Sequence, residues 1–216
     1  MNQKRIWRES RKDKSVIKNI LFDMDDVLCT YDFQRRLVML ADATGVPAPV
    51  IEERVFTSGF EDTADTGALT SDAYLKEFSR LIDAPVDLDA FIRARAETTI
   101  PDPQMIDVVK MVQRSHETAA LTNNGWFMAE NAQTIVPEIK ALFGDRFFVS
   151  AQIGASKLSV EAFTILLPRL GWAPEDTLFV DDFPDYIASA RTVGLHTHQF
   201  TTVEALKTDL HRLGVL

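Results

Sequence analysis

The pattern of apolar and polar positions first indicates a strand near the start of the chain. Residues 18–22 become apolar toward Phe22 and are followed directly by Asp23, Asp25 and Asp26. A buried strand that delivers acidic groups to its carboxyl end has this pattern, and open α/β sheets place their ligands at that edge. Clustered carboxylates repel one another unless a cation lies nearby. The sequence therefore predicts a metal site, a carboxylate nucleophile with an acid/base partner, or both, with a solvated acidic turn as the alternative.

The next stretch, about residues 33–99, has helical periodicity and few strand signals. Leu37 and Leu40, for example, fall on one helical face. The segment 70–72 offers N-cap chemistry for a following helix. We predict four short helices here, ending at the two prolines of segment 101–103, which disfavour continuation of a helix.

From residue 104 onward, short apolar segments alternate with amphipathic ones. Helices are predicted at 105–114, 159–170 and 185–192, and strands at 118–121, 146–149, 177–180 and 195–198. Residues 201–204 have a capping-box signature for a last helix. Strands that alternate with helices form parallel sheets, so the predicted fold class is α/β, a Rossmann-like doubly wound sheet. The core comprises residues 15–32 and 100–216, residues 33–99 form an inserted helical domain, and residues 1–14 form an N-terminal arm.

Composition excludes several classes of protein. The 216 residues carry a formal net charge of -9, which argues against a general nucleic-acid-binding surface. No apolar run approaches the roughly 18 residues that a membrane span needs, and residues 1–18 do not resemble a secretory signal. Cys29 is the only cysteine, so an intramolecular disulfide is impossible and a cytoplasmic location is expected. We interpret Cys29 as structural because no neighbouring cation is evident to lower its pKa.

Two further strand ends and one lysine carry candidate chemistry. Thr122 and Asn123 follow a predicted strand and offer groups suited to an oxyanion, although such residues are also common in turns. Asp181 and Asp182 form a second acidic strand end, and two such ends could converge on a hard cation such as Mg²⁺. Lys157 precedes a predicted helix, where its ammonium could neutralise a phosphate, although a lone lysine is more often a solvated surface residue.

The order of these groups resembles the four signature motifs of the haloacid dehalogenase superfamily. Asp-x-Asp after a strand is followed by Thr-Asn after a strand, a lysine before a helix, and Asp-Asp after a strand. The resemblance extends from about residue 17 to residue 216 and implies a Rossmann-like core with a C1 helical cap in its subfamily IA form. Phosphatases of small sugar phosphates, including glucose-1-phosphate phosphatases, look most similar.

The resemblance also implies catalytic roles. Asp23 matches the nucleophile that forms an aspartyl-phosphate. Asp25 matches the general acid/base that protonates the leaving oxygen and then activates water. Thr122 and the backbone of Asn123 match the groups that bind the phosphate oxygens, and Lys157 matches the cation that holds the nucleophile and the phosphoryl group together.

A magnesium ion is part of the same resemblance. It would be held by the Asp23 carboxylate, the Asp25 backbone carbonyl and Asp182, with Asp181 contributing directly or through water. The expected protein is thus a Mg²⁺-dependent phosphatase of a small soluble phosphorylated metabolite such as a sugar phosphate. We expect a monomer or homodimer with no nucleic-acid or membrane partner.

Asp25 separates two chemistries within the superfamily. A halide leaves without a proton, whereas an alkoxide leaving from phosphorus needs one, so Asp25 favours a phosphatase or phosphomutase over a dehalogenase. A phosphomutase resembling beta-phosphoglucomutase, a 2-haloacid dehalogenase and a non-catalytic binding protein remain the alternatives. Three positions depart from the family pattern: Asp26 replaces a usual Gly, Leu158 replaces a common Pro, and Tyr186 stands where Asn or Asp often completes the last motif.

Other polar and aromatic residues have structural interpretations. His196 and His198 could suggest a metal pair, yet no third ligand is apparent. Trp126 is expected to pack against the following helix or to line the cleft. Arg35 and Arg36 are interpreted as surface residues of an amphipathic helix rather than as substrate contacts.

Overall fold

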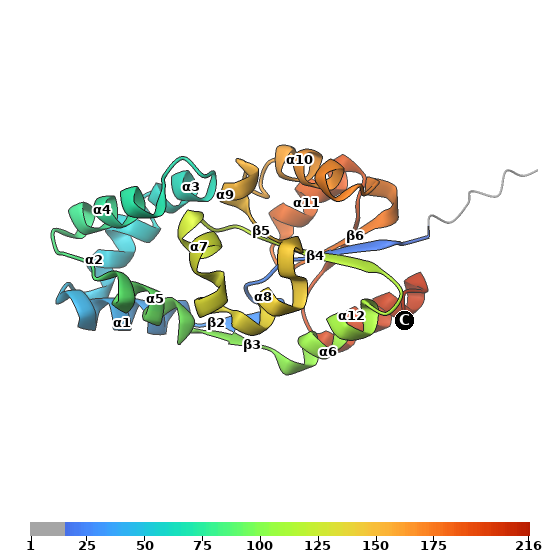
Figure 1. The fold of residues 1–216 in the computed structure, drawn as a ribbon, viewed down its shortest axis with the longest axis horizontal. Coiled ribbons are helices and arrows are strands. Elements are labelled where there is room, and N and C mark those ends of the chain that lie inside the picture. Colours follow the sequence, from blue (N-terminus) through green and yellow to red (C-terminus); the bar gives the residue numbers. More distant parts are fainter. Residues whose placement is uncertain (1–15) are drawn as a thin grey trace, which may run out of the picture.

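The computed structural model describes residues 16–216, and a five-stranded parallel sheet forms its centre (Figure 1). The strands lie in the order β5, β4, β1, β6 and β7, with bounds Phe147–Val149, Glu117–Thr122, Asn19–Phe22, Thr177–Asp181 and His196–Gln199. All neighbouring pairs are parallel, which confirms the predicted fold class. The predicted N-terminal arm, residues 1–14, lies outside the described residues.

Helices cover both faces of this sheet. Side chains along a strand point alternately to opposite faces, so Ile20 and Phe22 pack into one layer and Leu21 into the other. The first layer contains α6 (Pro103–Val112), α8 (Pro137–Phe143) and α12 (Val203–Leu213), and the second contains α10 (Val160–Leu170) and α11 (Pro184–Val193) (Figure 1). The remaining connections contain α7 (Trp126–Ile135), α9 (Ser150–Ile153) and the 3₁₀ turns Gly144–Arg146 and Pro174–Asp176.

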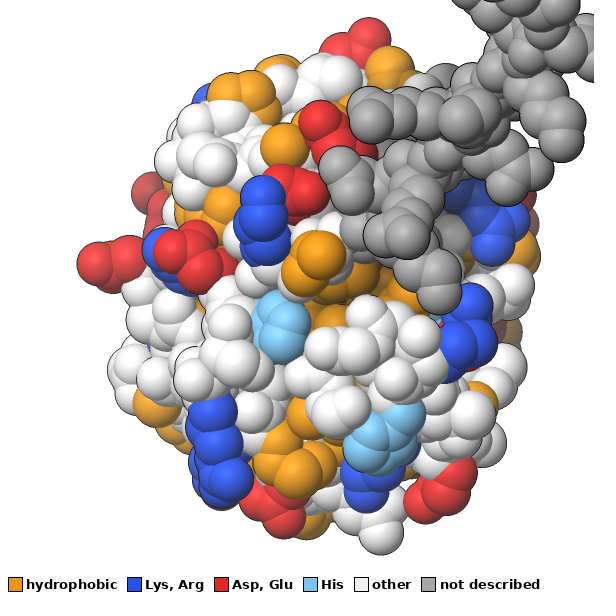
Figure 2. Space-filling view, turned by 90° about the vertical axis from the view of Figure 1, so that its right-hand side faces the viewer, with side chains coloured by type: hydrophobic (Ala, Val, Ile, Leu, Met, Phe, Trp, Pro, Cys, Tyr) orange, Lys and Arg blue, Asp and Glu red, His pale blue; other side chains and the backbone are white. Residues whose placement is uncertain are grey.

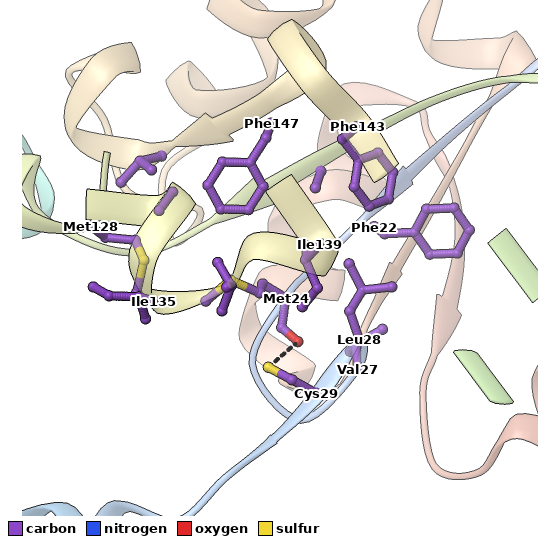
Figure 3. Close-up of a cluster of buried hydrophobic side chains, with 14 of the residues drawn as sticks. Phe22, Met24, Val27, Leu28, Cys29, Met128, Ile135, Ile139, Phe143 and Phe147 are labelled. Carbon is purple, nitrogen blue, oxygen red and sulfur yellow. Dashed lines mark hydrogen bonds between the residues drawn. The ribbon is translucent and has the colours of Figure 1, made fainter. Parts of the chain in front are cut away.

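Apolar packing supports the turn that follows β1 (Figure 3). The Phe22 and Phe143 rings lie 6.2 Å apart, and Met24 and Leu28 are fully buried in the same cluster. The Cys29 thiol donates to the Met24 carbonyl oxygen at 3.3 Å. Burial raises the pKa of this thiol above its ordinary value, so Cys29 is a packed, unreactive residue, as interpreted from the sequence.

A helical segment is inserted between two short strands, β2 (Cys29–Tyr31) and β3 (Thr99–Pro101), which pair as an antiparallel ribbon. It contains α1 (Phe33–Thr44), α2 (Ala48–Ile51), α3 (Phe60–Asp65), α4 (Ser71–Ile82) and α5 (Leu88–Ala96), with a π-helical turn at Glu52–Phe56. We call α1 to α5 the inserted helices. The prediction of four helices was wrong, because a helix of four residues is too short to show an apolar period.

A chain of aromatic rings joins the inserted helices to one another and to α7. Ring centroids lie 5.0 Å apart between Phe33 and Phe56, 6.1 Å between Phe56 and Phe78, and 5.3 Å between Phe78 and Phe91. Phe91 in turn lies 4.7 Å from Phe127 of α7. Each edge-to-face pair contributes about 0.5–1.5 kcal/mol beyond its buried area, so this chain fixes the inserted helices over the carboxyl edge of the sheet.

The N-caps of two helices can be compared with those predicted from the sequence. Thr70 caps α4 by accepting a hydrogen bond from the Ala73 amide at 3.3 Å, as predicted. The last helix is capped by Thr202, which accepts from the Ala205 amide at 3.1 Å, so the predicted capping box began one residue too early.

The end of the core away from the inserted helices has a mixed surface (Figure 2). Acidic and basic side chains are interspersed on this face, and neither kind forms a continuous field outside the area covered in grey. None of the described helices is long and apolar enough to cross a membrane.

Candidate active site

Three strand ends converge at the carboxyl edge of the sheet. Asp23 directly follows β1, Thr122 ends β4, and Asp181 ends β6. Because β1 lies between β4 and β6, Asp23 takes the middle position. The Asp23 amide continues the sheet by donating to the Val180 carbonyl oxygen at 2.9 Å, which fixes the backbone that carries the carboxylate.

Lys157 lies in the middle of these carboxylates. Its Nζ is 2.6 Å from Oδ1 of Asp23 and 2.7 Å from Oδ2 of Asp181, and the side chain is 1% exposed. Burial alone would lower the pKa of Lys157, but the two carboxylates outweigh it and raise that pKa above its ordinary value. Lys157 is therefore a buried ammonium, and the surface interpretation is excluded.

The acidic residues form a candidate metal centre. Asp23, Asp181 and Asp182 each offer an oxygen, and these oxygens lie within 4.8 Å of one another. Burial raises the pKa of Asp23, against the opposing effect of Lys157 and with support from Asp181. Burial and Asp181 also raise the pKa of Asp182. Three carboxylates that repel one another and offer only oxygen ligands fit a hard divalent cation such as Mg²⁺.

A pocket of about 180 Å³ opens above this cluster. Its lining includes Asp23, Asp25, Thr122, Asn123, Lys157 and Asp182. The structure thus brings together residues from widely separated parts of the sequence. Asp181 lies beside this group, fully buried, and its second oxygen accepts from the Phe183 amide at 2.8 Å.

Side-chain hydrogen bonds fix the positions of Lys157 and of the residues at the end of β4. The Asn123 Oδ1 accepts from the Lys157 amide at 3.0 Å, and its Nδ2 donates to Ser156 Oγ at 2.7 Å. Thr122 Oγ1 accepts from Asn124 Nδ2 at 2.8 Å. These hydrogen bonds engage both polar atoms of the Asn123 side chain.

Tyr186 replaces a polar residue of the family pattern and contacts Lys157. The lysine Nζ lies 4.6 Å from the centre of the Tyr186 ring, within the range of a cation–π contact. The Tyr186 hydroxyl accepts a hydrogen bond from Asn123 Nδ2 at 3.1 Å. Burial raises the pKa of Tyr186, so this residue stays a neutral aromatic wall beside the ammonium.

Asp26, the third carboxylate of the opening cluster, has a backbone role. Its φ of 58° lies in the left-handed region, which glycine adopts freely and which aspartate tolerates better than most residues. Its Oδ1 accepts a hydrogen bond from the Tyr31 amide at 3.1 Å. Asp26 therefore adopts a backbone conformation that glycine adopts freely, and its side chain ties the turn to β2.

Sequence reasoning missed Arg95 of α5. Its Nη2 donates to both oxygens of Asp25, at 2.8 and 2.6 Å, although the two residues are 70 positions apart. The side chain is 2% exposed. A signal was present: Arg95 lies on the same helical face as buried Phe91 and Ala94, where a surface arginine would not be expected.

Arg36 was predicted as a surface residue, which is wrong. It is 7% exposed, and its guanidinium lies 5.0 Å from the centre of the Phe91 ring and 2.8 Å from the Tyr31 hydroxyl. Its position one residue before Leu37, on the buried face of α1, was the missed signal. Arg35 is exposed, as expected.

The two histidines near the end of the core do not converge on one site. His198 Nδ1 lies 2.7 Å from Asp209 Oδ2, whereas His196 Nε2 lies 3.0 Å from the Glu175 carbonyl oxygen. Trp126 donates from its indole nitrogen to the Gly67 carbonyl oxygen at 3.2 Å. These residues have the structural contacts that the sequence suggested.

The family model for haloacid dehalogenase-like hydrolases matches residues 17–194, most of the chain. The chain belongs to this family. The match confirms the resemblance drawn from the order of the motifs, and it identifies the protein as a member of a hydrolase family.

Curated relatives cover the chain to different extents. D-ribitol-5-phosphate phosphatase of Bacteroides thetaiotaomicron is 23% identical over 189 residues, which are 85% of this chain and 92% of that protein. Acyl-CoA dehydrogenase family member 10 of Mus musculus is 26% identical over 154 residues, 68% of this chain but 14% of that protein. The chain thus spans a small part of the mouse relative and nearly all of the bacterial one.

Solved structures share the fold. A HAD-like family hydrolase from Porphyromonas gingivalis has a TM-score of 0.77 at 22% identity and covers 91% of this chain and 98% of that chain. A HAD family enzyme of Bacteroides thetaiotaomicron, in complex with magnesium and inorganic phosphate, has a TM-score of 0.73 at 17% identity. It covers 86% of this chain and 94% of that chain.

Proposed function

We propose that this hydrolase cleaves the phosphate monoester of a small metabolite and depends on Mg²⁺. The observation that carries the proposal is the buried Lys157 ammonium shared by Asp23 and Asp181 at the base of a pocket lined with Thr122 and Asn123. Positive charge and hydrogen-bond donors at that place suit the three oxygens of a phosphoryl group.

Asp23 is the nucleophile in this proposal. Its carboxylate attacks phosphorus and forms an aspartyl-phosphate while the bond to the leaving oxygen breaks. Lys157 holds Asp23 through Oδ1 at 2.6 Å and neutralises charge next to the phosphoryl oxygens. Thr122 and the Asn123 amide donate to those oxygens and hold the group for attack.

Asp25 serves as the proton shuttle. It lines the same pocket as Asp23, two residues further along the turn. It gives a proton to the leaving alkoxide and then takes one from the water that hydrolyses the aspartyl-phosphate, which regenerates Asp23.

The Asp23 carboxylate, the Asp25 backbone carbonyl and Asp182 would hold Mg²⁺, with Asp181 direct or through water. When bound, the ion supplies positive charge that offsets repulsion between the carboxylates and the phosphate. The fit of the acidic oxygens supports this assignment, and so does the related fold that binds magnesium and phosphate.

The inserted helices act as a cap over the core in this proposal, with residues 33–99 as the cap and residues 15–32 and 100–216 as the catalytic core. Support comes from the β2–β3 ribbon that connects them and from Arg95, which extends from α5 to Asp25. A cap in this place would surround the organic part of the substrate and exclude bulk water.

The test is phosphate release from a broad panel of phosphorylated metabolites, with Mg²⁺, by wild type and Asp23→Asn. We expect turnover by wild type and a loss of at least about 10³-fold in kcat for the variant. The matched control is Asp185→Asn, which removes an exposed carboxylate on the neighbouring α11 and keeps wild-type turnover. Absence of turnover across the whole panel would overturn the proposal, as would full activity of Asp23→Asn.

The same assay separates hydrolysis from phosphoryl transfer within one sugar. With a hexose 1-phosphate as substrate, a hydrolase releases inorganic phosphate. Appearance of the 6-phosphate without free phosphate would identify a phosphomutase instead.

A further inference from the structure

Tyr186 stands where Asn or Asp often completes the last motif, and its ring contacts the buried ammonium of Lys157. It lies in the first turn of α11 and lines the pocket above the acidic cluster, which we call the phosphate pocket. Lys157 Nζ is 4.6 Å from the centre of the ring. Asn and Asp have no aromatic face, so this contact depends on the departure from the motif.

The other neighbours of the ammonium leave part of it available to a ligand. Oxygens of Asp23 and Asp181 lie 2.6 and 2.7 Å from Nζ, so one of the three N–H donors of an ammonium remains for a phosphoryl oxygen. The fully buried Phe179 ring lies 5.9 Å from Nζ. Two carboxylates and two rings therefore enclose the ammonium of Lys157, whose side chain is 1% exposed.

An aromatic ring holds a cation without taking one of its hydrogen-bond donors. The attraction comes from the electron-rich face of the ring. A third carboxylate at position 186 would compete with the phosphate for the remaining N–H and for the charge of Lys157. The Tyr186 ring instead keeps the ammonium beside Asp23 and keeps water away from it, which strengthens its attraction for a phosphate.

The hydroxyl of Tyr186 contributes to the position of the same lysine at its backbone. It accepts from Asn123 Nδ2, and Asn123 Oδ1 accepts from the Lys157 amide at 3.0 Å. Asn123 Nδ2 also donates to Ser156 Oγ at 2.7 Å, so the asparagine stays anchored without the tyrosine. We therefore expect the ring, rather than the hydroxyl, to have the larger effect.

Packing fixes the ring in this place. Its centre lies 4.8 Å from that of the Phe183 ring, and it packs against the apolar layer that contains Phe179. Among residues 16–216, the hydrogen bond of the Tyr186 side chain goes to Asn123 and not to the candidate metal ligands. The contacts of Tyr186 thus lie on the lysine side of the site.

We propose that Tyr186 is a positioning residue that holds the Lys157 ammonium against the face of its ring, and that it thereby strengthens phosphate binding without supporting the metal. This inference rests on the proposed phosphatase function. Affinity for phosphate then follows the electron density of the ring at position 186, whereas the Mg²⁺ requirement does not.

Fluorination of the ring tests this directly, because fluorine withdraws electron density with little change in shape. Calorimetric titration with inorganic phosphate at saturating Mg²⁺ compares wild type, Tyr186→Phe, Tyr186→Leu and a trifluorinated phenylalanine introduced at position 186. We expect Tyr186→Phe to bind phosphate within about twofold of wild type. The fluorinated variant and Tyr186→Leu should both bind it about 3- to 30-fold more weakly, the range for loss of a cation–π contact.

Two further measurements separate positioning from a general effect on folding or on the metal. The value of kcat/KM for p-nitrophenyl phosphate should fall in parallel with phosphate affinity, whereas the Mg²⁺ concentration for half-maximal activity should stay within about twofold. Phe148→Leu removes another partly buried ring that packs against the same apolar layer. It is the control and should keep the phosphate affinity of wild type.

The outcomes distinguish the two proposals. Equal phosphate affinity in Tyr186→Phe and its fluorinated counterpart would overturn the role of the ring, as would a Mg²⁺ requirement that shifts together with phosphate affinity. Should Tyr186→Leu fail to fold, the fluorinated pair still decides. Wild type that binds phosphate but releases none from the ester panel refutes the phosphatase function alone, and wild type that binds no phosphate overturns both.

Discussion

Asp65 makes the stability of the protein depend on pH in an unusual direction. It ends α3 and lines a chamber between the inserted helices and the core, partly buried. Burial, reinforced by the charges of Glu61 and Asp62, raises the pKa of Asp65 from 3.8 to about 7. The folded state therefore holds a proton that the unfolded chain has already released, and the free energy of unfolding falls as the pH rises between these two values.

The size of the effect follows from the two pKa values. The interval from 3.8 to about 7 corresponds to about 4 kcal/mol at 1.36 kcal/mol per pH unit, of which about 2 kcal/mol falls above pH 5.5. Water entering the chamber reduces this figure, so it is an upper limit. Asp65→Asn removes the ionisation. The advantage of the variant over wild type should therefore grow by up to about 2 kcal/mol between about pH 5.5 and about pH 8.5.

Urea unfolding followed by tryptophan fluorescence, with a chelator present, measures this difference. Trp126 contacts the loop after α3 through Gly67 and reports on the relevant region. Asp42→Asn, at an exposed position of α1, is the control and should show no growing advantage. A difference between Asp65→Asn and wild type that stays constant over this pH range would refute the assigned pKa.

Three further results are expected. Gly67→Ala should lower the free energy of unfolding by about 1–3 kcal/mol more than Gly59→Ala. Both glycines have a positive φ, but only at Gly67 would the new Cβ overlap a carbonyl oxygen, that of Ala151. Equal losses in the two variants would contradict this. Asp26→Ala should lose about 2 kcal/mol through left-handed backbone strain and the lost bond to the Tyr31 amide, whereas Asp26→Asn should lose little; thermal denaturation tests the pair. Removal of divalent ions with a chelator should abolish phosphate release and added Mg²⁺ should restore it, and activity that survives chelation would exclude the metal role.

Much of the core was predictable because its signals are local. The apolar run before Asp23 and the acidic end of the strand before Asp181 each identify a buried parallel strand from consecutive residues. Their convergence then follows from the rule that parallel strands share a carboxyl edge. The buried state of Lys157 was not predictable from its neighbours in sequence, because it is stabilised by carboxylates 134 and 24 positions away.

The contacts around the inserted helices were harder to predict. The β2–β3 ribbon has three residues on each strand, too few for a detectable alternation, and its two strands are separated by a long insertion, so no local signal pairs them. Arg36 and Arg95 lie on apolar helical faces, and single-sequence reasoning assigned the first to solvent and overlooked the second. Their burial depends on Tyr31 and Asp25, which the tertiary fold brings to them.

The β2–β3 ribbon makes the inserted helices exchangeable. The chain leaves the core at Cys29 and returns at Pro101, and these two residues are paired neighbours on adjacent strands. The 67 residues between these strands, 32–98, form one long connection whose length and content leave the strand order of the core unchanged. The inserted helices could therefore be replaced as a unit, by evolution or by protein engineering. A replacement without a residue equivalent to Arg95 would leave Asp25 without its arginine partner.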